Sequence, residues 1–210
     1  MDEEQPYNPL DKRNLGFSVA EALLLRDPVA MGDLRSFAGA GVYAIYYVGN
    51  HPAYAPLTAL HAKTPYARPI YVGKSVPPGA RKGGFGLGAA AGNALFNRLR
   101  QHRASIEEAN DLNVADFFCR YLVVDDIWIP LGESLLIEMF QPVWNKVIDG
   151  FGNHDPGKGR YRQKRSPWDT LHPGRKWAER CPANPKQAAE FARESESFLK
   201  DSADYCKIQM

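Results

Sequence analysis

Three short runs of β-branched and aromatic residues stand out along the chain. They cover residues 41–48, 69–74 and 117–124, and Gly, Pro or polar residues bound each of them. This composition is typical of β-strands, and the separations between the runs leave room for helices. The pattern therefore predicts a small sheet built from three strands.

The first two predicted strands carry aromatic hydroxyls that can meet. Side chains alternate between the faces of a strand, so Tyr71 and Gly73 share one face of the second run. A glycine at that position leaves the backbone beside the tyrosine open to close approach. If the strand pairs with the first run, Tyr43 and Tyr71 come to one surface, with Lys74 at its rim.

Apolar residues at spacings of three and four predict helices on both sides of the third strand. In residues 93–109 the apolar face includes His102, and Arg98 points the same way because it lies four residues earlier. Residues 129–140 form the next helix, with Glu133 in its first turn, where the helix dipole favours a carboxylate.

The ends of the chain predict one helix each. Near the start, an apolar run follows Ser18, which we expect to cap a helix that closes before Pro28. Residues 190–200 predict a closing helix.

The expected fold class is α+β, with a small three-stranded antiparallel sheet flanked by helices. Residues 1–37 form an N-terminal arm, residues 38–148 the core, and residues 149–210 a basic extension.

Composition places the chain among ordinary globular proteins. Its 210 residues are 44% hydrophobic and 24% charged, enough for one good core. No apolar run approaches the ~20 residues of a membrane span, and the first residues do not resemble a secretory signal. The three cysteines lack the spacing of a disulfide framework or a zinc site, and Cys119 alternates with core residues. We therefore expect a cytoplasmic protein with no membrane partner.

Charge is segregated along the chain although the net charge is only +2. Residues 34–106 hold nine Lys or Arg and no acidic residue, whereas residues 107–149 hold nine acidic residues and two basic ones. Residues 150–180 are basic again, with eight Lys or Arg against three acidic residues. Such segregation indicates a polyanion held near a few carboxylates, although a solvated surface can show it by chance.

Several motifs resemble those of the GIY-YIG nuclease superfamily. The signature tripeptides read Gly41-Val42-Tyr43 and Tyr71-Val72-Gly73, with Val in place of Ile in both. Residues 97–102 resemble the superfamily helix that supplies an Arg and, in some branches, a His. Glu133 and the Pro-x-x-Asn of residues 142–145 match the metal-binding Glu and its following Asn. The resemblance covers about residues 39–181, with interruptions in two loops.

The resemblance implies a Mg²⁺-dependent nuclease, with Mn²⁺ as the other candidate ion. Glu133 is the implied metal ligand, and one carboxylate suffices because Mg²⁺ keeps several of its waters. Arg98 would neutralise charge that develops on the phosphate, since its planar double donor suits phosphate oxygens.

The remaining site residues take supporting roles in this scheme. Tyr43 is the candidate general base, acting on water directly or through His102. A free phenol has a pKa near ~10, so Lys74, Arg98 or the metal would have to lower it. Tyr71 would orient the phosphate or the water, and Asn145 would buttress the site.

Two basic segments are candidates for DNA contact. The glycine-rich residues 77–92 read as a basic flap, and the basic run of residues 158–165 suits phosphate contact and guanine readout. The long loop at residues 49–68 could also meet DNA, or be a disordered insertion. The predicted DNA-binding residues are Arg81, Lys82, Lys158, Arg160, Arg162, Lys164 and Arg165.

The tail and the long loop are similar to the type II restriction endonucleases of the superfamily, in the group that cuts CCGCGG. The resemblance implies cleavage of double-stranded DNA to 5′-phosphate and 3′-hydroxyl ends. Each chain has one site and a palindrome needs two cuts, so we expect a homodimer or a dimer of dimers.

Three other functions fit parts of the sequence. One is a structure-specific or repair nuclease of the same superfamily, and another is a non-catalytic DNA-binding module that kept the fold. The third is nucleotide binding by the glycines of residues 86–92. Pro77-Pro78 interrupts the strand that a dinucleotide motif must follow, and this excludes the third reading.

Overall fold

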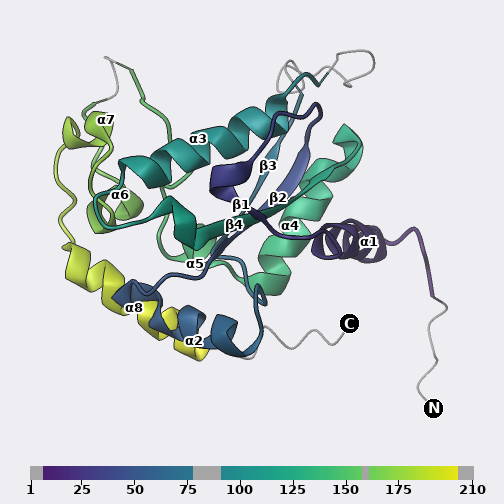
Figure 1. Ribbon diagram of the computed structural model, residues 1–210, viewed down its shortest axis with the longest axis horizontal. Helices are drawn as coiled ribbons and strands as arrows, with labels where there is room; N and C mark the ends of the chain where they lie inside the picture. Colours follow the sequence, from purple (N-terminus) through teal and green to yellow (C-terminus); the bar gives the residue numbers. More distant parts are fainter. Residues whose placement is uncertain (1–6, 78–90, 158–160, 203–210) are drawn as a thin grey trace.

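The computed structural model describes residues 7–77, 91–157 and 161–202 (Figure 1). Strands and helices are mixed as far as β4, and in the described residues after it only helices follow. In order they are α1 (Lys12–Leu24), β1 (Val29–Ala30), η1 (Met31–Asp33), β2 (Gly41–Tyr47), η2 (Pro52–Tyr54), α2 (Ala55–Lys63), β3 (Tyr71–Ser75), α3 (Ala94–Glu108), η4 (Val114–Asp116), β4 (Phe117–Val123), η5 (Asp126–Trp128), α4 (Ile129–Phe140), α5 (Val143–Lys146), α6 (Pro167–Leu171), α7 (Lys176–Glu179) and α8 (Ala188–Asp201).

The described strands form one antiparallel sheet in the order β1-β4-β2-β3. The three predicted strands are β2, β3 and β4, and the predicted α+β class is confirmed. A fourth strand, β1, adds only two residues beside β4, too few to leave a pattern in the sequence. Because β3 is last in the order, one of its edges has no strand partner among the described residues.

Helices cover both faces of the sheet (Figure 1). The face that carries Tyr43 and Ile45 packs against α3 and the segments after α4. The other face, with Val42 and Ala44, packs against α1 and α4. All seven residues of β2 are therefore buried, which explains why apolar side chains occur on both of its faces.

Two predictions for the N-terminal half are corrected. Helix α1 begins at Lys12, six residues before Ser18, because the carboxylate of Asp11 accepts a hydrogen bond from the Arg13 amide at 2.8 Å and caps it. The loop at residues 49–68 is ordered and forms η2 and α2. Tyr54 and His61 are buried there, so these two residues pack rather than face DNA.

Two further features of the sequence have a clear outcome. Cys119 is buried in β4, and burial raises the pKa of its thiol to about 12, which fits a core residue and not a nucleophile. Within residues 7–77, 91–157 and 161–202, no helix is long and apolar enough to span a bilayer. Helix α8 includes residues 190–200, where the sequence predicted a closing helix, and it packs beside α2 and η2 (Figure 1).

Acid is expected to destabilise the fold through its buried histidines. Burial lowers the pKa of His61, His102 and His172 below the ordinary value of 6.5. Below that pH the unfolded chain binds protons that the folded chain does not. Each ring can therefore lower the free energy of unfolding by up to ~1.4 kcal/mol per pH unit. Urea unfolding at about pH 7.5 and about pH 5.5 should give a lower free energy at the acid pH. An unchanged value would mean that the folded protein protonates these rings without cost.

Candidate active site

The two phenols of the signature strands meet on one face of the sheet. Tyr43 lies opposite Gly73 in the β2–β3 ladder, and Tyr71 is two residues away on the same face. The ring centroids of Tyr43 and Tyr71 are 6.2 Å apart. A Cβ atom at Gly73 would overlap the phenol oxygen of Tyr43, so only glycine leaves room for that ring.

Gly73→Ala should therefore weaken both fold and site. The added methyl has to displace the buried Tyr43 ring, and overpacking of this kind costs ~1–3 kcal/mol. Urea unfolding measures the loss, and a cleavage assay follows the site. Gly32→Ala is the matched control because a Cβ there meets nothing within 4 Å. Equal stability of the two variants would contradict the packing argument.

A hydrogen bond joins Tyr43 to the helix α3. The phenol oxygen of Tyr43 lies 2.6 Å from Nε2 of His102, and both side chains are buried. Burial, then the positive charge of Arg98, holds the pKa of His102 well below its usual value. His102 is therefore neutral, and its ring stacks on Phe151 at 4.5 Å between centroids.

Burial controls the ionisation of Tyr43 as well. It raises the pKa of this phenol well above 10.0, and the charge of Tyr71 acts in the same direction. Arg98 lowers this pKa, as the sequence-based scheme requires, but burial outweighs it. In the protein alone, a neutral phenol is therefore hydrogen-bonded to a neutral imidazole.

Arg98 lies between the phenols and a loop that follows α5. Its guanidinium interacts with Tyr43 and Tyr71. Its charge and its hydrogen bonding both act to lower the pKa of these phenols. Nη2 donates to the carbonyl of Gly152 at 3.1 Å, and Nη1 donates to Nε2 of His154 at 2.5 Å. The loop thus fixes the side of the guanidinium that the phenols do not touch.

Glu133 reaches the same site from α4, on the opposite face of the sheet. Its carboxylate raises the pKa of Tyr43 and Tyr71, and it forms an ion pair with Lys74 at 2.7 Å. The first turn of α4 holds no acidic residue, so the predicted position of Glu133 in that turn is wrong. The carboxylate is 19% exposed and opens toward solvent beside β3.

Asn145 binds the free edge of β3. Its Oδ1 accepts from the amide of Val72 and its Nδ2 donates to the carbonyl of Val72, both at 2.8 Å. The amide of Trp144 donates to the carbonyl of Ile70 at 3.0 Å, so α5 runs along this edge. Val72 lies between Tyr71 and Gly73, and Asn145 therefore fixes the strand that carries the site.

Two places among the described residues offer ligands for a metal ion. One is Glu133. The other is a cluster of His51, Asp111 and His172, whose ligand atoms lie within 4.8 Å of one another. Hydrogen bonds already use the atoms of this cluster: His172 Nδ1 and His51 Nε2 lie 3.0 Å and 3.2 Å from Oδ2 of Asp111.

The proton positions in that cluster follow from the hydrogen bonds of the rings. The carboxylate of Asp111 can only accept, so Nδ1 of His172 donates to it, and Nε2 of the neutral ring accepts from the hydroxyl of Tyr54, 2.6 Å away. The Ala53 amide donates to Nδ1 of His51. The nitrogens that face Asp111 therefore carry the protons. Asp111 accepts from both rings, and these bonds contribute to lowering the pKa of its carboxyl.

The structure describes three of the seven predicted DNA-binding residues. Arg162 and Lys164 are exposed. Arg165 donates from Nε to the carbonyl of Ala178 at 3.2 Å, which attaches its segment to α7. Four of the predicted residues lie outside the described part of the chain: Arg81, Lys82, Lys158 and Arg160.

The sequence-based interpretation missed the segment that faces Arg98. Phe151 stacks on His102, while Gly152 and His154 bind Arg98. Arg175 holds the same segment from behind, although by sequence it is one more basic residue of the tail. The one signal near it in the sequence is that Trp168 and Trp177 lie on either side of Arg175. In the structure their rings cover its guanidinium at 4.4 Å and 4.8 Å.

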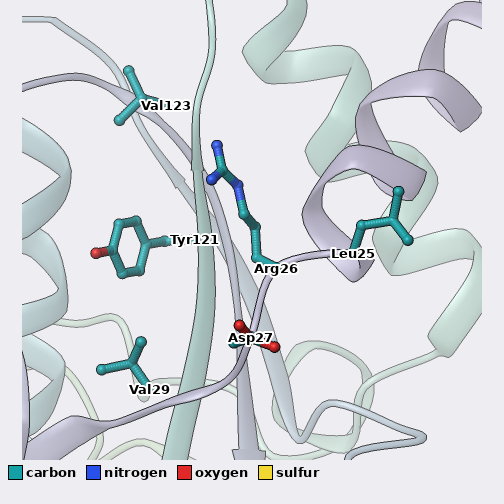
Figure 2. Close-up of a pocket in the computed structure, with 6 residues that line it drawn as sticks. All are labelled: Leu25, Arg26, Asp27, Val29, Tyr121 and Val123. Carbon is teal, nitrogen blue, oxygen red and sulfur yellow. The ribbon is translucent and has the colours of Figure 1, made fainter.

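A hollow of about 410 Å³ lies where α1 ends, next to β1 and β4 (Figure 2). Its lining includes none of the predicted site residues. Its lining residues are Leu25, Arg26, Asp27, Val29, Tyr121 and Val123.

Comparison with known proteins gives a family for most of the chain. The family model described as the Eco29kI GIY-YIG domain matches residues 35–199. No curated protein matches the chain. The matched range includes every site residue described above.

Proposed function

The chain belongs to the family of the Eco29kI GIY-YIG domain, a family of restriction endonucleases, and we propose that it is a type II enzyme that hydrolyses double-stranded DNA with Mg²⁺. The observation that supports this most directly is the meeting of two phenols, a guanidinium and one carboxylate. They come from β2, β3, α3 and α4, and they are close enough to shift one another's pKa. A module that only binds DNA has no need of this set.

The carboxylate of Glu133 fits a hard divalent cation. It is an oxygen ligand, it is partly exposed, and within the described structure its ion-pair partner is the side chain of Lys74. Mg²⁺ is commonly held by one or two carboxylates together with phosphate oxygens and water. When bound, the ion would neutralise charge on the phosphate and on the leaving oxygen.

The side chains supply a path for the proton of the attacking water. In the proposed reaction, the oxygen of Tyr43 takes a proton from water while its own proton passes to Nε2 of His102, 2.6 Å away. The hydroxide attacks phosphorus, the bond between phosphorus and the 3′-oxygen breaks, and that oxygen takes a proton from solvent water to become the 3′-hydroxyl. Arg98 donates to the phosphate oxygens as negative charge develops.

The finer features of the proposal rest on the resemblance to the type II restriction endonucleases of the superfamily. We propose CCGCGG as the recognition sequence, 5′-phosphate and 3′-hydroxyl ends, and a symmetric homodimer in the cytoplasm. One site per chain supports the dimer, since a palindrome is cut once on each strand. The mass of the protein on a duplex with one CCGCGG should equal two chains or a multiple of two. A single chain on a duplex that it cuts would contradict the dimer.

Two plasmids that differ at one CCGCGG provide the test. With Mg²⁺ we expect the protein to linearise the plasmid that has the sequence and leave the other intact. Sequencing of the fragment ends then gives the cut position and the end chemistry. A smear would remove the site specificity, and binding without any cleavage would favour the non-catalytic module.

A further inference from the structure

A buried ion pair lies behind the loop of residues 150–154. Arg175 is 1% exposed, and its Nε donates to Oδ1 of Asp169 at 2.6 Å. Asp169 is buried as well, and its second oxygen accepts from the hydroxyl of Ser166 at 2.6 Å. Isolated buried charges are costly, so such a pair persists where its geometry and its other hydrogen bonds are good.

The other nitrogens of Arg175 bind the loop itself. Nη2 donates to the carbonyl of Gly150 at 2.9 Å. Nη1 donates to the carbonyls of Phe151 and Asn153, both at 3.1 Å. Three of four successive carbonyls therefore point at one guanidinium.

The remaining carbonyl points to the active site. Gly152, between Phe151 and Asn153, accepts from Nη2 of Arg98 at 3.1 Å. His154, the next residue after Asn153, accepts from Nη1 of Arg98. The loop thus lies between two guanidinium groups: three of its carbonyls face Arg175, whereas the carbonyl of Gly152 and the side chain of His154 face Arg98.

The geometry points to Arg175 as a positioning residue: with Asp169 it holds the loop so that Gly152 and His154 keep Arg98 turned toward the phenols. The inference rests on the proposed function, because it assigns the origin of the Arg98 orientation in that reaction. A planar guanidinium with five N–H donors suits this task. A lysine keeps the charge but offers one nitrogen with no fork geometry.

Arg175→Lys is therefore expected to slow cleavage more than it weakens DNA binding. We expect the single-turnover rate to fall by ~100-fold, the usual size for a misplacement of about 1 Å at a reacting group. DNA affinity without Mg²⁺ should stay within about 3-fold, because Arg175 is buried. Nicking of supercoiled plasmid is the readout, since one cut per molecule is detectable.

A double-mutant cycle separates positioning from a general structural role. In an Arg98→Ala background, Arg175→Lys should change the rate by less than about 3-fold, because Arg98 is no longer there to be oriented. An equal fall in both backgrounds, or no fall in the wild-type background, would overturn the inference. A wild-type protein that cuts no DNA would instead overturn the proposed function.

Two further variants keep the test decisive. Arg175→Met with Asp169→Leu replaces the ion pair by apolar side chains, which folded proteins often tolerate, and removes the loop contacts. If Arg175→Lys does not fold, this double variant gives the same comparison. Arg120→Lys is the control, because Arg120 also donates to a backbone carbonyl, that of Arg26, but lies with Ala44 and Tyr46 on the face of the sheet opposite Tyr43. Its cleavage rate should stay at the wild-type value.

Discussion

Replacing Glu133 by Gln is expected to abolish DNA cleavage and to leave DNA binding intact. The amide has the shape of the carboxylate but no charge, so it is a poor ligand for Mg²⁺. We expect the cleavage rate to fall at least ~10³-fold, which corresponds to about 4 kcal/mol of lost transition-state stabilisation. Single-turnover cleavage at saturating Mg²⁺ and DNA affinity without Mg²⁺ are the two measurements.

The fold of the Glu133 variant should be nearly unaffected. Lys74 loses its partner, but its side chain is 39% exposed, and exposed ion pairs contribute only ~0–1 kcal/mol. Glu138→Gln is the matched control, since Glu138 lies on the same helix and its partner is the exposed Arg13. Cleavage by the Glu133 variant at the wild-type rate would remove the metal ligand from the proposed mechanism.

Tyr43→Phe should have the second largest effect. The change keeps the buried ring and removes the oxygen that, in the proposed reaction, takes a proton from water and passes one to His102. General-base catalysis contributes ~10²–10⁴-fold, and we expect the cleavage rate to fall by an amount in that range. Single-turnover cleavage at saturating Mg²⁺ is the measurement.

Tyr46→Phe is the control for this experiment. Tyr46 lies on the same strand and is equally buried, but it packs with the residues on the other face of the sheet. Removal of the Tyr46 hydroxyl should leave the cleavage rate within about 3-fold of the wild type. If Tyr43→Phe retains the wild-type rate, the proton must leave the water by another route, and His102 would lose its place in the mechanism.

Much of this site could be predicted from the sequence because its parts sit on regular elements. A strand fixes its side chains with a period of two, so Tyr71 and Gly73 share a face wherever the strand lies. A helix does the same for Arg98 and His102, four residues apart. The pattern of apolar residues alone does not show that these elements form one site. The motifs of the family indicated that they do.

Other features of the sequence were ambiguous until the chain was folded. Residues 49–68 could be a DNA-contacting loop or a disordered insertion, and they form η2 and α2 because Tyr54 and His61 find partners far along the chain or in the sheet. Ser18 and Asp11 are both residues that can cap a helix, and the bond to the Arg13 amide decided for Asp11.

By itself, the sequence determined strands β2, β3 and β4, the helices α3 and α4 and the residues that carry the proposed chemistry, since local periodicity and local motifs encode these. Only the tertiary structure decided how the site is supported. It placed Asn145 on the edge of β3, and it placed Arg175 and Asp169 behind the loop that faces Arg98. The reason is physical: irregular segments have no repeating dihedral angles, so their partners are set by packing between residues far apart in the chain.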